Sequence, residues 1–204
     1  MGREGADEAA KRVFDVVVAG VALVVLAPLL AVTALAIRLE SPGPAVFRQV
    51  RVGRHGEPFR MHKLRTMAPI HDGRTVSPAH DARVTRLGRF LRRSKIDELP
   101  QLLDVVAGRM SLVGPRPELP EFVALWPSAQ RDVILSVRPG ITDPASIALR
   151  NEADELAHVA DPRRHYVESL LPRKAAMYAD YVRTRTFLRD LVVLAQTAVV
   201  VVGR

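Results

Sequence analysis

The fold is decided by residues 13–37, an apolar stretch that reads VFDVVVAGVALVVLAPLLAVTALAI. Asp15 is the only charged residue in it. A straight helix of these 25 residues would be about 37 Å long, enough to cross the ~30 Å hydrocarbon core of a bilayer. The stretch is longer than the apolar region of a secretory signal, and it ends at Arg38-Leu39-Glu40 rather than at a small-residue cleavage site. It therefore predicts a retained membrane segment.

Two placements of this segment stay open on physical grounds. Pro28 removes a backbone donor and bends or breaks a helix, and the helix before it is too short to cross alone. Basic residues flank both ends, so a segment that bends and returns keeps both flanks on the cytoplasmic side. A single crossing with a proline kink is the alternative, because membrane helices tolerate proline. We expect Asp15 at interface depth, on the same helix face as Arg12.

The rest of the chain is strongly basic. The 204 residues carry a formal net charge of +8, and residues 1–37 hold three basic and four acidic side chains. The whole excess therefore lies on residues 38–204. Such a charge predicts an anionic partner, which can be nucleic acid, a phosphate-bearing substrate or an acidic membrane face. The absence of cysteine excludes a disulfide scaffold, a thiolate metal site and a cysteine nucleophile.

Hydrophobic periodicity and turn residues predict an α+β fold that is mostly helical. The segments on either side of Gly53-Arg54-His55-Gly56 predict an antiparallel hairpin, with strands at residues 45–52 and Pro58–Leu64. Residues 69–80 are typical of a mobile loop, and residues 111–120 must be extended or turning because they contain three prolines. Helices are expected at residues 83–95, 97–107, 146–159, 162–184 and, as an interfacial or core helix, at Phe187–Val202.

The adjacent carboxylates Asp97 and Glu98 admit two interpretations. Taken alone, the pattern favours helix capping, with Asp97 as the N-cap, Pro100 in the first turn, and a weak capping box that starts at Ser94. In the functional interpretation, the helix dipole and the neighbouring arginines keep Asp97 ionised and nucleophilic. Glu98 would then point elsewhere and could hold a hard divalent cation such as Mg²⁺.

Other polar residues are weaker signals when each is taken alone. Arg116 stands between Pro115 and Pro117, and a guanidinium fixed in this way suits phosphate or carboxylate, although an exposed turn is the simpler account. The six histidines show no metal-ligand spacing. The basic run at residues 83–95 carries no nucleic-acid-binding motif, so contact with an acidic membrane surface is the better account of it.

Together these segments resemble the bacterial sugar transferase family, the small monotopic phosphoglycosyl transferases. The resemblance covers nearly the whole chain, and the DELPQL…MSLVGPRP spacing is its most specific part. The matching strings are KRVFD (residues 11–15), QVRVGR (49–54), KLRTM (63–67), DARVTRLG (81–88), FLRRSKIDELPQLLDVVAGRMSLVGPRPE (90–118) and RPGIT (138–142).

The resemblance implies transfer of a sugar-1-phosphate from a UDP-sugar to polyprenyl (undecaprenyl) phosphate, with release of UMP. It implies that Asp97 is the nucleophile of a covalent phosphosugar intermediate, and that Glu98 binds Mg²⁺. It also implies a re-entrant membrane segment that bends at Pro28, which favours that placement over a single crossing. Further catalytic and substrate-binding residues expected from the matching strings are Lys63, Arg92, Arg116, Pro115, Pro117, Arg65 and Arg138.

On this basis residues 1–40 are a re-entrant membrane anchor, and residues 41–204 a catalytic domain with interfacial amphipathic helices. The domain is expected on the cytoplasmic face of the bacterial inner membrane, where it begins the synthesis of a glycoconjugate. The expected partners are a UDP-sugar, polyprenyl phosphate and anionic lipid, with no nucleic acid; downstream glycosyltransferases and a second copy of the chain are further candidates. The alternative is a non-catalytic scaffold that binds anionic lipid or a glycosyltransferase.

The chain departs from the common family pattern at several positions. Ala27 stands before Pro28 where serine is frequent, so Pro28 alone must provide the bend. Asp104 and Arg109 replace a usual asparagine and an acidic residue, and we expect them to form a compensating pair. Residues 143–146 read DPAS where a Gly-aromatic-Gln stretch is frequent. The sugar should be read by the loops after Arg138, where the departure is largest.

Overall fold

A computed structural model describes residues 3–68, 75–79 and 81–202. The fold is mostly helical with one small antiparallel hairpin, which confirms those parts of the predicted fold class. The strands are β1 (Val46–Val52), β2 (Pro58–Leu64), β3 (Ser111–Val113) and β4 (Gly140–Thr142). The helices are α1 (Arg3–Glu40), α2 (Arg86–Ser94), α3 (Gln101–Val106), α4 (Pro120–Val123), α5 (Ser128–Leu135), α6 (Pro144–Ala148), α7 (Glu152–Ala157), α8 (Pro162–His165), α9 (Leu171–Thr184) and α10 (Phe187–Val202). Shorter helical turns are η1 (Arg54–Gly56), η2 (Ile96–Glu98) and the π-helical η3 (Tyr166–Leu170).

The predicted hairpin is confirmed. Strands β1 and β2 pair antiparallel from Val46 opposite Leu64 to Val52 opposite Pro58. The turn between them contains η1, in which His55 takes a left-handed conformation with φ of 58°. A second, parallel pair joins β3 to β4. The residues of β3 were expected only as extended or turning chain, and no strand was predicted at β4. The hairpin matters for function because Lys63 and Leu64 are the last residues of β2, and β2 contacts the turn that carries Asp97.

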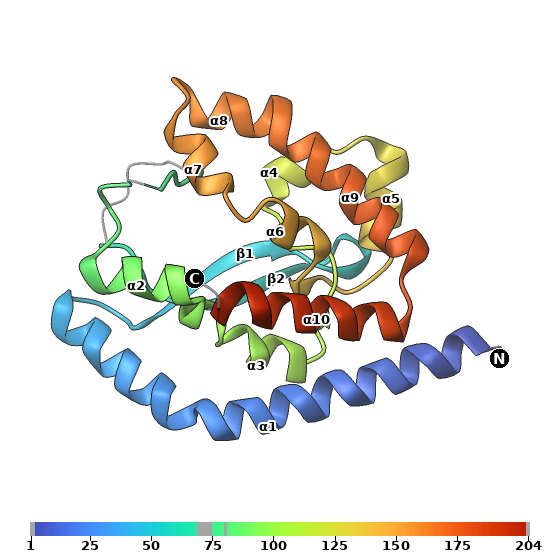
Figure 1. The fold of residues 1–204 in the computed structure, drawn as a ribbon, viewed down its shortest axis with the longest axis horizontal. Coiled ribbons are helices and arrows are strands. Elements are labelled where there is room, and N and C mark those ends of the chain that lie inside the picture. Colours follow the sequence, from blue (N-terminus) through green and yellow to red (C-terminus); the bar gives the residue numbers. More distant parts are fainter. Residues whose placement is uncertain (1–2, 69–74, 80, 203–204) are drawn as a thin grey trace.

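The apolar N-terminal segment forms one helix, α1, which continues through Pro28. Figure 1 shows that this helix is bent, so that its two halves run in different directions. The expected helix-break-helix is therefore seen as a bend without an interruption. One face packs on the body through Ala19 and Ile37, both nearly fully buried, whereas Val24 on the other face is 76% exposed. The return of the segment to the membrane face that it entered stays a prediction.

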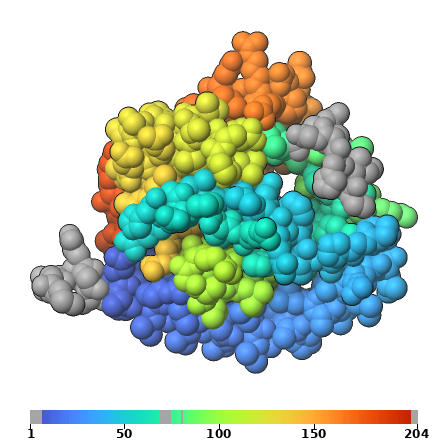
Figure 2. All heavy atoms as spheres, turned by 180° about the vertical axis from the view of Figure 1, so that it is seen from behind, coloured from blue at the N-terminus to red at the C-terminus, as the bar shows by residue number. Residues whose placement is uncertain are grey.

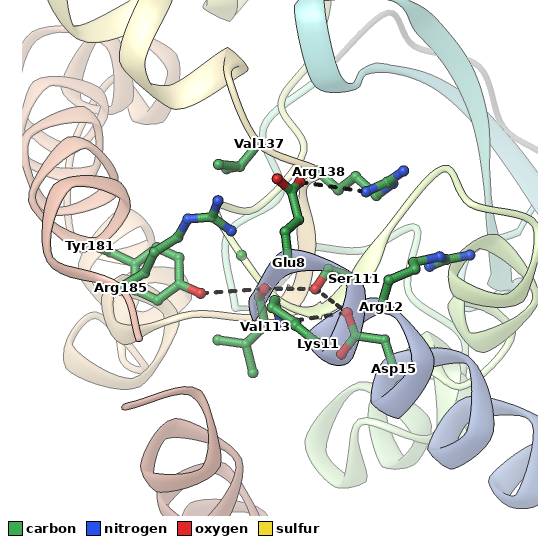
Figure 3. A pocket seen from close by; sticks show the side chains of 11 residues that line it. Glu8, Lys11, Arg12, Asp15, Ser111, Val113, Val137, Arg138, Tyr181 and Arg185 are labelled. Atoms are coloured by element: carbon green, nitrogen blue, oxygen red, sulfur yellow. Dashed lines mark hydrogen bonds and ion pairs between the residues drawn. The ribbon is translucent and has the colours of Figure 1, made fainter. Parts of the chain in front are cut away.

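Polar contacts hold the first half of α1 on the body (Figure 3). Arg12 donates to the carbonyl oxygens of Val105, Val106 and Met110 at 2.8–3.3 Å, and so caps the end of α3. The buried Asp15 accepts a hydrogen bond from Ser111 at 2.6 Å. These contacts fix α1 relative to α3 and the start of β3, which follow Asp97 and Glu98 in the chain.

Arg12 and Asp15 both line one small cavity against the body, in keeping with the helix face that they were expected to share. The ion-pair partner of Asp15 is Lys11, four residues earlier, at 3.5 Å. Lys11 also forms a 2.7 Å ion pair with Asp190 of α10. Asp15 is 2% exposed and lies against the body, so its charge is compensated within the protein.

The elements form layers above α1. Helices α3 and α10 lie next to α1, the two small sheets lie in the middle, and α4–α9 cover the far side (Figure 1). Seen from behind, α3 is wedged between α1 and the hairpin (Figure 2). One apolar cluster joins α4, α5 and α9 around Trp126 and Tyr178, and a second joins α1, α3 and α10 around Val105. The two small sheets of the central layer therefore lie between two apolar cores.

Several predicted helices have different limits in the structure. The helix expected at residues 97–107 begins later, at Gln101, because η2 precedes it as a separate tight turn. The helix expected at residues 146–159 is divided into α6 and α7, where Asp143 caps α6 by accepting from the Ser146 backbone N–H at 2.9 Å. The helices expected at residues 83–95 and 162–184 and at Phe187–Val202 are present. Most of the loop expected at residues 69–80 lies outside the described residues.

The expected pair of Asp104 and Arg109 is confirmed. Arg109 donates to Oδ1 of Asp104 through Nε at 3.0 Å, and its Nη2 forms an ion pair with the same oxygen at 2.9 Å. The fully buried Asp104 also accepts from the backbone N–H of His62 at 2.9 Å. Helix α3 is therefore tied to β2 one residue before Lys63.

Candidate functional site

The carboxylate pair lies on a tight turn between two helices. Lys95 ends α2 in a left-handed conformation with φ of 59°, and the chain then makes the single 3-10 turn η2 before α3. This path turns both Asp97 and Glu98 inward, so they are 1% and 7% exposed. Buried carboxylates normally have hydrogen-bond partners, which makes the contacts of this pair informative.

Asp97 does not act as a helix cap. Neither of its carboxylate oxygens has a hydrogen-bond partner among the described residues, although both are buried. The ammonium of Lys63 on β2 forms an ion pair with Oδ2 at 2.8 Å, outside hydrogen-bonding geometry. Ser94, the expected start of a capping box, donates back to Phe90 within α2 instead. The capping interpretation is therefore wrong, and Asp97 presents a buried carboxylate that is paired with Lys63 and accepts no hydrogen bond within the described residues.

Glu98 is the centre of a group of cations. Arg116 donates to both of its oxygens, with Nη1–Oε2 at 3.1 Å and Nη2–Oε1 at 2.7 Å, the forked geometry of a strong guanidinium–carboxylate pair. Lys63 and Lys95 lie 3.5 and 3.9 Å from Oε1. Burial alone would raise the pKa of Glu98, but the charges of Arg116, Lys63 and Lys95 hold this pKa well below its usual range. The charge of Glu98 in turn raises the pKa of Arg116.

Arg116 is held by the backbone of its own turn. The Pro115 carbonyl accepts from the Gly140 N–H at 2.9 Å, and the Pro117 carbonyl accepts from Arg51 at 3.2 Å. Gly114 and Gly140 approach so closely that a Cβ on either would collide with the backbone of the other. Pro115 and Pro117 thus act through the position of the turn, which aims the guanidinium at Glu98.

Arg92 reaches the same region from α2. It donates to the Thr66 hydroxyl through Nε at 2.9 Å and to the Ser77 hydroxyl through Nη1 at 3.0 Å. Burial lowers the pKa of Arg92, while the nearby charge of Asp97 raises it. Lys63 was predicted from one string and Arg92, Asp97 and Arg116 from another, and the structure brings these residues together around Glu98.

A cavity of about 660 Å³ opens beside this group, a size typical of small-molecule sites. Glu98, Arg116 and Lys95 line one side of it, and apolar side chains from α1 and α10 line another. These apolar residues include Leu26, Leu194 and Val200. The cavity therefore has a charged end and an apolar wall, to which α1 contributes Leu26 and α10 contributes Leu194 and Val200.

Two predicted substrate-binding residues have structural contacts elsewhere. Arg65 donates to Ser41 and Ile37 carbonyl oxygens at 2.7 and 3.3 Å, and so caps the end of α1. Arg138 donates to the Gly108 carbonyl at 2.9 Å and lines a small cavity of about 20 Å³ beside α1 (Figure 3). Neither lines the large cavity. Pro28 lies within α1.

Sequence reasoning missed several residues of the cavity wall. Lys95 was seen only as part of a basic run, although its left-handed conformation turns it towards Glu98. Lys174 and Glu152 also line the cavity. A signal for Lys174 was present, because it shares a helical face with Leu171 and Tyr178, and a lysine in an apolar stripe is unusual.

The carboxylate pair has the donor chemistry that Mg²⁺ takes. Mg²⁺ in proteins is bound through one or two carboxylates, with substrate phosphates and waters as the other ligands. Asp97 and Glu98 are adjacent, and the oxygens of Asp97 are free of hydrogen bonds. Over the described ranges, no group of three or more acidic or histidine side chains is placed to hold a metal. The carboxylate pair therefore suits a metal ion whose other ligands are supplied by a phosphate-bearing substrate.

The lowered pKa of Glu98 predicts how the stability of the fold depends on pH. Glu98→Gln leaves Arg116 without its charged partner and should lower the free energy of unfolding by about 3 kcal/mol at neutral pH. Because the pKa is lower in the folded chain, this contribution is complete above the unfolded value of about 4.3 and is lost as the pH falls further.

This dependence can be followed by thermal unfolding with the fluorescence of Trp126, the only tryptophan and a buried one. The difference in Tm between the wild type and Glu98→Gln should be constant from about pH 8 to 5, and should shrink below about pH 4. A difference that already shrinks between pH 8 and 6 would show that Glu98 is not held ionised.

Comparisons with known proteins identify the family of the chain. The profile of the family described as "Bacterial sugar transferase" matches residues 6–204. The UDP-glucose:undecaprenyl-phosphate glucose-1-phosphate transferase of Caulobacter vibrioides is 42% identical over 92% of this chain and 67% of its own length. The Escherichia coli enzyme of that name is 41% identical over 74% of this chain and 34% of its own length. A UDP-N-acetylgalactosamine-undecaprenyl-phosphate N-acetylgalactosaminephosphotransferase of Aeromonas hydrophila is 40% identical over 71% of this chain and 35% of its own length.

Proposed function

The chain belongs to the bacterial sugar transferase family, whose relatives named above are phosphoglycosyl transferases, and from this premise we propose that it transfers a sugar-1-phosphate from a UDP-sugar to undecaprenyl phosphate. The observation that carries the proposal is the buried Asp97 carboxylate, which is free of hydrogen bonds, paired with Lys63 and near Arg92, while Arg116 binds the adjacent Glu98. Such a group is suited to attack a phosphate whose charge the cations neutralise.

We propose a route of two displacements at one phosphorus atom. In the first, an oxygen of Asp97 forms a bond to the sugar-linked phosphorus, and the bond from this phosphorus to the bridging oxygen breaks. That oxygen leaves with UMP, and an acyl phosphate ester of the sugar remains on Asp97. In the second, an oxygen of undecaprenyl phosphate attacks the same phosphorus and the bond to Asp97 breaks. The products are undecaprenyl diphosphosugar and the free carboxylate, so no proton or electron has to be supplied.

The residues around Asp97 have distinct roles in this proposal. Lys63, 2.8 Å from Oδ2 of Asp97, holds the nucleophile in place and opposes the charge that develops on the phosphate oxygens. Arg116, fixed in its proline turn, and Arg92 bind the diphosphate as planar donors. Glu98 is the residue that would hold Mg²⁺, by exchanging part of its pairing with Arg116 for the metal, which when bound neutralises phosphate charge.

The acceptor accounts for the position of the cavity beside α1. Among the described residues, one helix, Asp7–Glu40, is long and apolar enough to cross a membrane. We propose that this helix and the exposed apolar side chains of α10, such as Leu188 and Val199, place the protein on the cytoplasmic face of the bacterial inner membrane. The apolar wall with Leu26 and Leu194 would then receive the first isoprene units of the acceptor.

A non-catalytic scaffold is not favoured. A scaffold needs basic residues on its surface, but it does not need a buried carboxylate without hydrogen bonds, such as Asp97, next to a residue that lines a large cavity, such as Glu98. Burying a carboxylate without hydrogen bonds lowers the stability of the fold, and such destabilising groups are concentrated at functional sites. Nucleic-acid binding has only the net charge of +8 in its support.

The experiment that tests the function is a screen for UMP release. The purified protein in detergent is incubated with Mg²⁺, undecaprenyl phosphate and one member of a panel of UDP-hexoses and UDP-N-acetylhexosamines. We expect UMP release with at least one UDP-sugar, together with a lipid product that carries the sugar. Absence of UMP with the whole panel, from protein that unfolds cooperatively, would refute the proposed activity and favour the scaffold.

A further inference from the structure

The large cavity has a second charged wall that the proposed displacements do not use. It is formed by Lys174 of α9 and Glu152, the first residue of α7. Lys174 is only 6% exposed, which is unusual for a lysine and requires that its charge be paired. Both residues line the same cavity as Glu98 and Arg116, so a ligand bound at the phosphate end has them within the same space.

The charge of Lys174 is engaged by partners within the protein. Its ammonium donates to Oε1 of Glu152 and to the Tyr166 hydroxyl, both at 3.3 Å, and lies 3.0 Å from Oε2 of Glu152. It also forms an ion pair with Oε1 of Glu118 at 3.4 Å. The Tyr166 hydroxyl donates to Glu118 at 2.6 Å, so it accepts from Lys174. With two carboxylates and a hydroxyl around it, Lys174 is a positioning residue.

The same cluster is fixed to the phosphate end of the cavity. Glu118 follows Arg116 by two residues in the proline turn and is buried. Arg51 lies 3.6 Å from its second oxygen, which completes the pairing of the carboxylate. The turn that aims Arg116 therefore also sets the position of Lys174 and, through Lys174, of Glu152. The distance between the two ends of the cavity is determined by side chains that are themselves buried.

Glu152 is the member of the cluster with spare capacity. Its side chain is 27% exposed, and its carboxylate contacts Lys174 alone among the side chains of the described ranges. A carboxylate has about four acceptor positions, so at least two stay available on the cavity side. Hydrogen bonds to a charged acceptor are about twice as strong as neutral ones. A pair of neighbouring hydroxyl groups would fill these positions.

Resting on the proposed function, we propose that Glu152, held by Lys174, binds hydroxyl groups of the donor's sugar and thereby selects which UDP-sugar is used. A carboxylate repels the diphosphate, and an apolar isoprene chain offers it no hydrogen. The sugar is the part of the donor that is neutral and rich in hydroxyl donors. The ribose of the nucleotide also carries two hydroxyl groups, so the test must separate ribose from sugar.

The test compares Glu152→Gln with the wild type, using the UDP-sugar that the wild type turns over fastest and its epimer at a single hydroxyl group. The measurements are kcat/KM for UMP release with each donor and the inhibition constant of UMP. We expect kcat/KM for the preferred donor to fall about 10- to 100-fold, and the preference over the epimer to shrink by about tenfold. Inhibition by UMP, which has the ribose but no sugar, should stay unchanged.

Matched variants decide between a site and a structural effect. Glu155→Gln makes the same change on α7, at a side chain that pairs with His165 and does not line the cavity, and it should leave both donors unaffected. Glu152→Asp keeps the charge but shortens the reach, and should also reduce the preference. An equal loss with both donors, an unchanged preference or a weaker inhibition by UMP would overturn the proposal. Because the wild type must first release UMP, none of these results is confused with failure of the proposed activity.

Discussion

Replacing Asp97 with asparagine should abolish UMP release from the preferred UDP-sugar, with kcat reduced at least about 10³-fold. An amide is a poor nucleophile, and no other carboxylate can replace Asp97, because Glu98 is occupied on both oxygens by Arg116. The loss should be seen in kcat, since the cations that bind the diphosphate remain. Asp97→Ala should give the same result, which excludes recovery of activity through deamidation of the new asparagine.

The stability of the Asp97→Asn variant separates this result from misfolding. Asp97 makes no hydrogen bond within the described residues, so its replacement removes a buried charge and should leave Tm unchanged or raised. Asp104→Asn is the matched control at a carboxylate that is equally buried but fully hydrogen-bonded. It should lower Tm and keep turnover within about tenfold of the wild type. Wild-type turnover in Asp97→Asn would show that the nucleophile is misassigned.

Replacing Arg116 with lysine should lower kcat/KM about 10²-fold although the charge is kept. The guanidinium donates to both oxygens of Glu98 in a fork, whereas an ammonium cannot reproduce two parallel hydrogen bonds. Each lost hydrogen bond to a charged partner is worth about 1.5–3 kcal/mol, and about 1.4 kcal/mol corresponds to tenfold. The variant should also move Glu98, and with it the diphosphate, relative to Asp97.

Arg109→Lys is a close control for this variant. Arg109 also pairs with a buried carboxylate, that of Asp104, through a hydrogen bond from Nε and an ion pair from Nη2, but it does not line the cavity. It should keep kcat/KM within about threefold of the wild type. If both substitutions reduced kcat/KM equally, the effect of Arg116→Lys would be a general consequence of a weakened ion pair, and its role in substrate binding would be wrong.

The local elements could be predicted where the pattern itself determines them. The hairpin followed from its Gly-rich turn, and α10 from an apolar run without prolines. Strands β3 and β4 could not be foreseen, because each has three residues and its partner lies far along the chain. The helix expected from Asp97 was wrong at its start, since the left-handed Lys95 separates η2 from α3. The site depends on that turn.

The site was predicted in its charged centre and missed at its far wall. Specific motifs marked Asp97, Glu98 and Arg116, and the structure joins them. Single arginines could not be assigned from motifs, because capping a helix end, as Arg65 does, requires the same residue type as binding phosphate. The role of Lys174 could not be predicted from the sequence, because only the fold shows that Glu152, Tyr166 and Glu118 surround its ammonium.

The covalent route is tested most directly by intact-protein mass spectrometry with the donor alone. The wild-type protein is mixed with its preferred UDP-sugar and Mg²⁺ without undecaprenyl phosphate, and UMP and protein mass are followed together. We predict a burst of one UMP per protein, with one sugar-phosphate added to the peptide that contains Asp97, and loss of this adduct when undecaprenyl phosphate is supplied. UMP release that requires both substrates, from protein that never gains mass, would contradict the account.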